Sequence, residues 1–216
     1  MRRSETTVSQ RVLNIWAISL IIWSFYRVGF QTNLPIWFDE GIVKPLIFLV
    51  PAAWYIRRME KKTLLGGFAL MRPTRHAMRE ALLVGIILIC ISFIMHMYKG
   101  GNVLVISIAH FSIIPTVFSI IAVIVEQLLS TGFVFKRLYE DKKQVFSPVL
   151  TSAALYFFLH IPVLFGPSTI VLSSVILTVV LNTILSVMAS ILYIRHKNTL
   201  PSLVVSACFV IALLVA

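Results

Sequence analysis

The sequence predicts an all-α fold, a polytopic membrane helix bundle of about seven to eight helices with a cytoplasmic N-terminus. Hydrophobic residues make up 59% of the 216 residues and charged residues only 12%, whereas soluble globular proteins carry about 25% charged residues. Apolar stretches run from one end of the chain to the other, so we expect a single integral membrane domain over residues 1–216. The basic residues between these stretches are unevenly distributed, which predicts the orientation.

Seven apolar stretches are the expected spans, and most reach the length of about 17–25 residues that crosses a bilayer. They cover residues 12–30, 41–56, 80–97, 103–129, 147–165, 168–194 and 200–216. The second contains Pro45 and Pro51, so we expect it to be kinked or tilted. The fourth contains Pro115 and continues as LLSTGFVF, so we expect a break near Pro115 and a second helical part that enters the cytoplasm.

The basic residues test this layout. Segments 1–12, 57–79, 136–143 and 195–197 hold sixteen of the 19 lysines and arginines, and with seven spans all four segments lie on one side. The positive-inside rule assigns that side to the cytoplasm and the C-terminus to the opposite side. The longest segment, 57–79, is expected either to lie on the inner membrane surface or to be a solvated connector.

The net charge of +11 fits contact with anionic lipid headgroups, because its distribution follows the spans. We therefore expect the lipid bilayer as a partner and no nucleic acid. We expect the protein in the plasma membrane of a bacterium or an archaeon. Cys90 and Cys208 both lie in apolar stretches and are expected to be buried small hydrophobes without a disulfide.

Ionisable and strongly polar residues inside spans are costly and point to function. Arg27 lies near a span end, where its side chain can reach the interface, and His110 is expected to bond between helices. Glu126 lies 10 residues before Lys136, about 15 Å along a helix. His160 and Asn182 each lie 13 residues from the same side of the membrane, about 20 Å.

Three polar groups on three successive helices therefore lie at a similar depth. They are either structural polar residues or the lining of a polar cavity reached from the cytoplasm. A glutamate and a histidine around one cavity suit water activation, and they suit a proton-coupled transporter equally well. Two ligand-type residues fall short of the three protein ligands of a catalytic zinc site, so no metal and no other cofactor is expected.

The stretches EQLLSTGFVFKRL (126–138) and ALYFFLHIP (154–162) resemble the CAAX-protease and bacteriocin-processing family of intramembrane proteases. That family's motifs are Glu-Glu-x3-Arg, usually followed by Gly, then Phe-x3-His, then His-x3-Asn or Asp. The stretches at 34–55 and 194–207 are also similar to such proteins. The resemblance implies that Glu126 activates water for attack on a peptide carbonyl, with His160 as its partner, in a protease-like core over residues 126–210.

The chain departs from the family's motifs at several positions. Gln127 stands at the position of the second glutamate and Thr131 at that of the arginine, and Tyr156 replaces the phenylalanine. Ser206 and Val210 stand where the third motif has His and Asn or Asp. The resemblance implies that these last two positions help to bind the oxyanion, and losing one such donor costs about 10²–10³ in rate. Gln127, Thr131, Tyr156, Asn182 and Ser206 are the candidate supporting residues.

Three functions therefore stay open. The first is a divergent intramembrane endopeptidase, with reduced or lost activity, that acts on a peptide or membrane-protein substrate. The second is a non-catalytic membrane protein of the same fold, with an immunity or interaction role, which the departures favour. The third is a small proton-coupled transporter, and the absence of an internal repeat argues against it.

Overall fold

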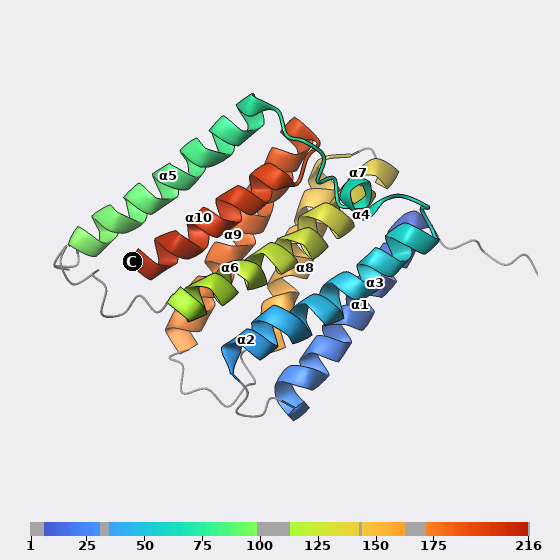
Figure 1. Cartoon of the computed structure of the whole chain (residues 1–216), viewed down its shortest axis with the longest axis horizontal. Helices are drawn as coiled ribbons and strands as arrows, with labels where there is room; N and C mark the ends of the chain where they lie inside the picture. The colour runs from blue at the N-terminus through green and yellow to red at the C-terminus, as the bar shows by residue number, and fades with distance from the viewer. Residues whose placement is uncertain (1–6, 31–34, 99–112, 143, 163–171, 216) are drawn as a thin grey trace, which may run out of the picture.

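The computed structural model describes residues 7–30, 35–98, 113–142, 144–162 and 172–215 (Figure 1). These residues form helices joined by short connections, with no strand among them, which confirms the predicted all-α membrane bundle. The helices in chain order are α1 (Val8–Phe25), η1 (Tyr26–Phe30), α2 (Ile36–Phe38), η2 (Asp39–Val43), α3 (Lys44–Arg58), α4 (Leu64–Gly67), α5 (Arg75–Tyr98), α6 (Ile113–Gln127), η3 (Leu128–Phe135), α7 (Lys136–Lys142), α8 (Phe146–His160), α9 (Leu172–His196) and α10 (Leu200–Val215).

Each predicted span is occupied by a long helical run in the described residues. Four runs are long and apolar enough to cross a membrane by length and composition, at Val8–Gly29, Arg75–Met95, Ile113–Lys142 and Val179–His196. Phe146–His160 and Leu200–Leu213 are shorter apolar helices. The number of crossings and the cytoplasmic N-terminus stay predictions.

The elements η1, η2 and η3 are π-helical turns within longer helices. In η2 the Lys44 backbone N–H bonds the Asp39 carbonyl, five residues back, directly before Pro45, which has no N–H to donate. The fourth run continues through Pro115 to Lys142, so the expected break does not fall within residues 113–142. Residues 103–112, which include His110, lie outside the described residues. The irregularity in this run is η3, which follows directly after Glu126 and Gln127.

The interior consists of aromatic and aliphatic side chains between the helices. The largest cluster joins α1, α3, η3 and α8 and includes Trp16, Trp23, Phe48, Phe133 and Tyr156. A second cluster joins α5, α9 and α10 and is built from Ala81, Leu185, Leu192, Val205 and Phe209.

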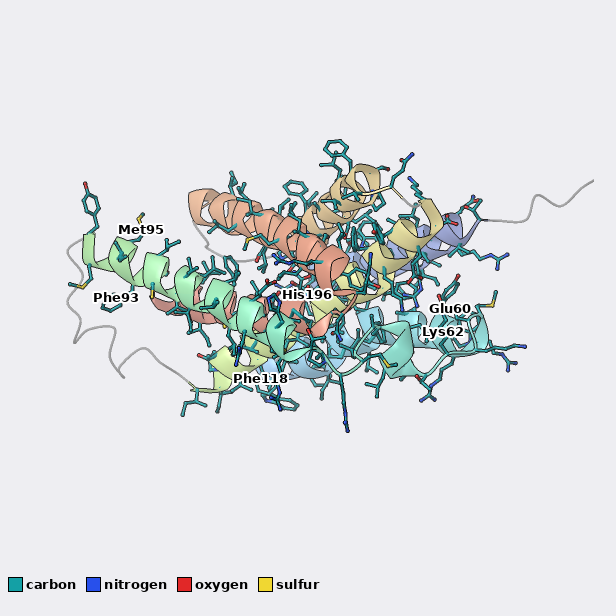
Figure 2. All side chains as sticks on the ribbon, turned by 90° about the horizontal axis from the view of Figure 1, so that it is seen from above. Glu60, Lys62, Phe93, Met95, Phe118 and His196 are labelled. Atoms are coloured by element: carbon teal, nitrogen blue, oxygen red, sulfur yellow. The ribbon has the colours of Figure 1, made fainter. Side chains whose placement is uncertain are left out.

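The outside of the bundle is also apolar, as a lipid-facing surface requires. Figure 2 shows Phe93 and Met95 near the end of α5, and both side chains are exposed. Cys90 is exposed on the same helix, so its expected burial is wrong, because this face of α5 is not covered by another helix. Cys208 is half-buried, and both cysteines are free.

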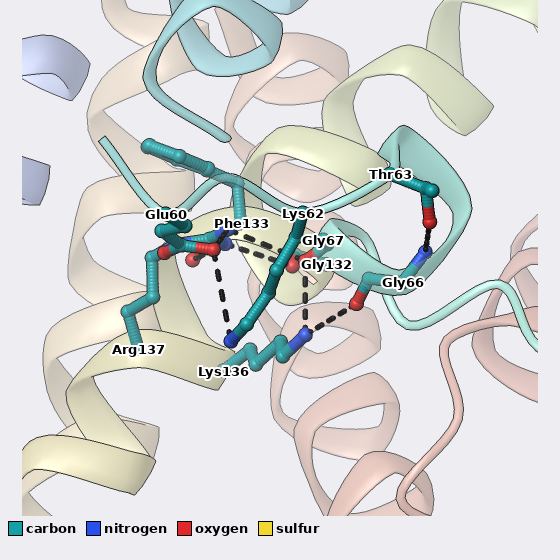
Figure 3. Close-up of polar contacts among 9 residues, drawn as sticks. All are labelled: Glu60, Lys62, Thr63, Gly66, Gly67, Gly132, Phe133, Lys136 and Arg137. Atoms are coloured by element: carbon teal, nitrogen blue, oxygen red, sulfur yellow. Dashed lines mark hydrogen bonds and ion pairs between the residues drawn. The ribbon is translucent and has the colours of Figure 1, made fainter. Parts of the chain in front are cut away.

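The described basic segments lie at one end of the bundle, which we call the basic end. It contains the end of α3, α4, the start of α5, α7 and the end of α9 (Figure 1). Lys136 and Arg137 hold the connection over residues 59–71 against the basic end (Figure 3). Lys136 Nζ donates to the Gly66 and Gly67 carbonyls at 2.7 and 3.0 Å. This connection therefore packs against the helix that carries Glu126.

Candidate active site

Glu126 lies at the end of α6, directly before the π-helical η3, and its side chain is buried among groups from other helices. The Tyr156 hydroxyl, from α8, donates to Glu126 Oε2 at 3.1 Å. His160 Nε2, one turn further along α8, is 3.6 Å from the same oxygen. The residues matched to the first and second motifs therefore meet across two helices.

The hydrogen bonds of His160 indicate its tautomer. Nδ1 is 3.0 Å from the Tyr156 carbonyl oxygen, which can only accept, so Nδ1 carries a hydrogen. In the neutral ring Nε2 is then an acceptor, and the Asn182 amide Nδ2 on α9 is 3.2 Å from it. The ring is thus oriented on both sides, with Nε2 3.6 Å from Glu126 Oε2. Glu126, His160 and Asn182, which the sequence placed at a similar depth, lie together here.

Lys44 is a site residue that the sequence analysis missed. Its Nζ is 2.7 Å from Glu126 Oε1 and 2.5 Å from Glu40 Oε2, and its side chain is only 7% exposed. Lys44 lies near the outer end of the second apolar stretch, where a lysine can also reach the interface. Counted from the predicted cytoplasmic side, however, Lys44 lies 14 residues before Arg58, about 21 Å along a helix. This depth is similar to those of His160 and Asn182.

Further side chains from the first two helical runs lie near Lys44. The Trp23 ring has the Lys44 ammonium 5.3 Å and the Arg27 guanidinium 5.4 Å from its centroid. Both distances are within the range of a cation–π interaction. The Tyr26 hydroxyl donates to the buried carboxylate of Asp39. The polar site therefore extends from α8 and α9 through α6 to the first two helical runs.

The remaining candidates lie apart from these contacts. The Thr131 hydroxyl donates to Gln127 Oε1 at 2.9 Å, and both side chains are fully buried. The two positions at which the first motif departs from the family thus contact each other as a neutral pair. Ser206, also buried, donates to the Ser202 carbonyl on its own helix at 2.8 Å.

The site offers a carboxylate, an imidazole, a phenol and an ammonium group in contact. Such a set can accept a proton from water, pass it on and stabilise a developing negative charge. In the described part of the chain, no group of three or more His, Cys, Asp and Glu side chains is placed to hold a metal ion.

Comparison with known families is informative for the second half of the chain. Residues 112–212 match the family model described as Type II CAAX prenyl endopeptidase Rce1-like. The family resemblance is confirmed over this stretch. The CAAX-protease match includes Glu126, Tyr156, His160 and Asn182, whereas Lys44 precedes it. No curated protein and no solved structure matches the chain.

Proposed function

We propose that this integral membrane protein is an intramembrane endopeptidase in which Glu126 activates the attacking water. The observation that carries the proposal is the contact of Glu126 with His160 and Tyr156, inside the stretch that matches the CAAX-protease family. Peptides and membrane-anchored proteins are the proposed substrates, because the buried site lies between apolar helices.

The reaction is a hydrolysis. The oxygen of a water molecule attacks the peptide carbonyl carbon while Glu126 takes one proton from that water. The electron pair of the C=O π bond moves to the carbonyl oxygen. The resulting tetrahedral oxyanion collapses and the C–N bond breaks. The proton held by Glu126 passes to the leaving amine, which yields a carboxylic acid and an amine. Nε2 of His160, 3.6 Å from Glu126, can relay this proton when the hydrogen bond from Asn182 breaks.

The other residues position this pair. The Tyr156 hydroxyl bonds Glu126 Oε2, and the Tyr156 carbonyl fixes the His160 ring. The Asn182 amide bonds the other ring nitrogen. Reacting groups must be held within fractions of an ångström, so these contacts from two helices support a catalytic geometry.

A second candidate is a non-catalytic member of the same fold, and specific contacts favour it. Gln127 and Thr131 form a neutral pair where the family motif is charged, and Ser206 bonds its own helix. Lys44 forms an ion pair with Glu126, so the carboxylate of the proposed base is already engaged. An immunity or interaction role would need the fold but no reaction.

The test compares Glu126→Gln with wild-type protein in proteoliposomes. The probes are a panel of prenylated and membrane-helix peptides, and cleavage is followed by mass spectrometry. We expect Glu126→Gln to lower the rate at least about 10²-fold, as removal of a general base does. Glu140→Gln, at an exposed glutamate on α7, is the matched control and keeps wild-type activity.

His160→Asn provides a second variant in case Glu126→Gln fails to fold, and it is expected to lose about 10²-fold as well. Absence of cleavage by wild-type protein, with an active relative cleaving the same peptides, would exclude the peptidase and favour the non-catalytic candidate. Cleavage that persists in both variants would remove Glu126 and His160 from the mechanism.

A further inference from the structure

Lys44 is a buried cation that the mechanism above does not use. Its ammonium lies between the carboxylates of Glu40 and Glu126, at 2.5 and 2.7 Å, and the Trp23 ring lies 5.3 Å away. It comes from α3, whereas Glu126 comes from α6. The cation therefore reaches the proposed base from a helix outside the stretch that matches the family.

A purely structural role does not account for this lysine. Replacing a buried ion pair with apolar residues of similar volume is often neutral or stabilising. Trp23 beside Lys44 and Phe48 one turn further along α3 belong to the apolar core cluster, so apolar side chains could also join α3 to α6. A cation at this position is better explained by its ability to stabilise negative charge that develops during a reaction.

Among the groups that contact Glu126 directly, Lys44 is the one with a donor to spare in the described residues. The Tyr156 hydroxyl donates to Glu126 and the Asn182 amide to His160. Ser206, at the position of a third-motif residue, donates within its own helix. An ammonium group has three N–H donors, and the two carboxylates that contact Lys44 accept two of them.

The distances fit an oxyanion contact. A water bound to Glu126 lies about 2.7–2.8 Å from the carboxylate oxygen, and the carbonyl oxygen that becomes negative is bonded to the carbon which this water attacks. Lys44 Nζ is 2.7 Å from Glu126 Oε1, so it lies within reach of an oxygen on a carbon attacked by a water that Glu126 binds. Its flexible four-carbon stem allows the small shift from carboxylate to oxyanion.

We propose that Lys44 is the oxyanion-binding residue of this site. Its ammonium donates a hydrogen bond to the tetrahedral oxyanion without transferring a proton, and it returns to Glu126 when the C–N bond has broken. Such stabilisation acts on the transition state more than on bound substrate. The inference rests on the proposed peptidase function, and it assigns the charge-stabilising role to the second helical run.

The experiment measures peptide cleavage by Lys44→Met and Lys44→Arg, with Lys142→Met as the matched control. Lys142 is an exposed lysine on α7, so its variant removes the same charge outside the site. We expect Lys44→Met to lower kcat by about 10²–10³, as loss of an oxyanion donor does. KM should change little, because the lost contact forms only in the transition state. Lys44→Arg keeps a cation and should retain part of the rate.

A phosphinate peptide, which carries a tetrahedral anionic centre, gives a readout that a structural role would not move. Its affinity should fall in parallel with kcat/KM across the Lys44 variants, while affinity for the uncleaved peptide stays unchanged. If Lys44→Met unfolds, the Glu40→Gln/Lys44→Met double variant removes one of the two carboxylates left without a cation and is tested in the same way.

The outcomes separate the two proposals. Wild-type kcat and phosphinate affinity in a folded Lys44→Met protein would overturn the role of Lys44 and leave the peptidase function intact. Equal losses of substrate and phosphinate affinity would assign Lys44 to packing and overturn the inference. A wild-type protein that cleaves no peptide and binds no phosphinate would overturn both.

Discussion

At the scale of single residues, Arg137 holds the 59–71 connection against the bundle. Its Nε and Nη2 bond the two carboxylate oxygens of Glu60 at 2.6 and 2.9 Å. Nη1 bonds the Phe133 carbonyl at 2.9 Å, and Nη2 reaches the Gly67 carbonyl at 3.3 Å. The guanidinium also lies 4.2 Å from the Phe133 ring centroid. One planar group thus joins the connection to η3, which follows the candidate active site.

We expect Arg137→Ala to expose this connection to protease. Removing one partner of a fully buried ion pair costs about 3–5 kcal/mol, and the loss here should be smaller because Glu60 is partly exposed and keeps Lys62 Nζ at 3.9 Å. Arg137→Lys should recover little, since lysine lacks the planar fork that binds Glu60 through two oxygens. Trypsin cleavage after Arg57, Lys61 or Lys62 in detergent-solubilised protein measures the effect.

Lys142→Ala is the control for that experiment, because Lys142 is exposed and does not contact the 59–71 connection in the described hydrogen bonds. Its Nζ donates to Ser147 Oγ at 3.2 Å. Wild-type cleavage rates in Arg137→Ala would mean that the Lys136 contacts alone hold the connection.

The candidate site was partly predictable from single residues. Counting residues to the basic end placed Glu126, His160 and Asn182 at a similar depth, and the structure brings them together. The same count would have included Lys44. The depth of a residue does not say which face of its helix it occupies. The ion pair between Lys44 and Glu126 forms only because α3 and α6 are rotated so that these side chains face each other, and hydropathy does not predict that rotation. Whether these residues catalyse a reaction stays a prediction.

At the scale of elements, the helices themselves were predictable and their irregularities were not. An apolar stretch of about 20 residues is a strong signal, because backbone groups in lipid must be satisfied within the helix. The π-helical turns at η2 and η3 shift hydrogen bonds by one residue without a matching change in composition. The proline pattern indicated irregularity in the second run, whereas no proline marks η3 in the fourth. The break expected near Pro115 borders residues 103–112, which lie outside the described residues, so it stays a prediction on that side.

The contact between α5 and α10 depends on a glycine. A Cβ atom on Gly85 would lie 2.5 Å from Cys208 Sγ and 2.8 Å from its Cβ, closer than real atoms approach. Small residues at such positions allow membrane helices to pack closely. The α5–α10 contact is among the more extensive in the described bundle.

We expect Gly85→Ala to destabilise the protein by about 1–3 kcal/mol, the usual cost of overpacking. The measurement is the apparent unfolding temperature in detergent at a fixed scan rate. Gly29→Ala is the matched control, because a Cβ there meets nothing within 4 Å and alanine favours helix by up to about 1 kcal/mol. Equal shifts for both variants would contradict close packing at Gly85.

At the scale of the whole molecule, the charge distribution and the bundle agree. Every basic segment in the described residues that the sequence assigned to the cytoplasm lies at the basic end or at the start of α1 (Figure 1). Helical runs that alternate in direction bring these segments together only if each run traverses the bundle. The predicted seven crossings would be the four long runs, the two shorter apolar helices and the run of α2, η2 and α3.

Cysteine labelling tests this orientation. In a background without Cys90 and Cys208, single cysteines replace residues at connections on both sides, namely Gly29, Lys61, Tyr98, Lys142 and Lys197. With the basic end inside, a membrane-impermeant maleimide added to intact cells should label only the cysteines at positions 29 and 98. All five should react after permeabilisation, which controls for buried thiols. Labelling at position 61 in intact cells would reverse the orientation, and labelling at 142 but not at 61 would remove one crossing between them. The prediction that the polar cavity around Glu126 is reached from the cytoplasm depends on this result, because the depths of Glu126 and His160 were counted from the basic end.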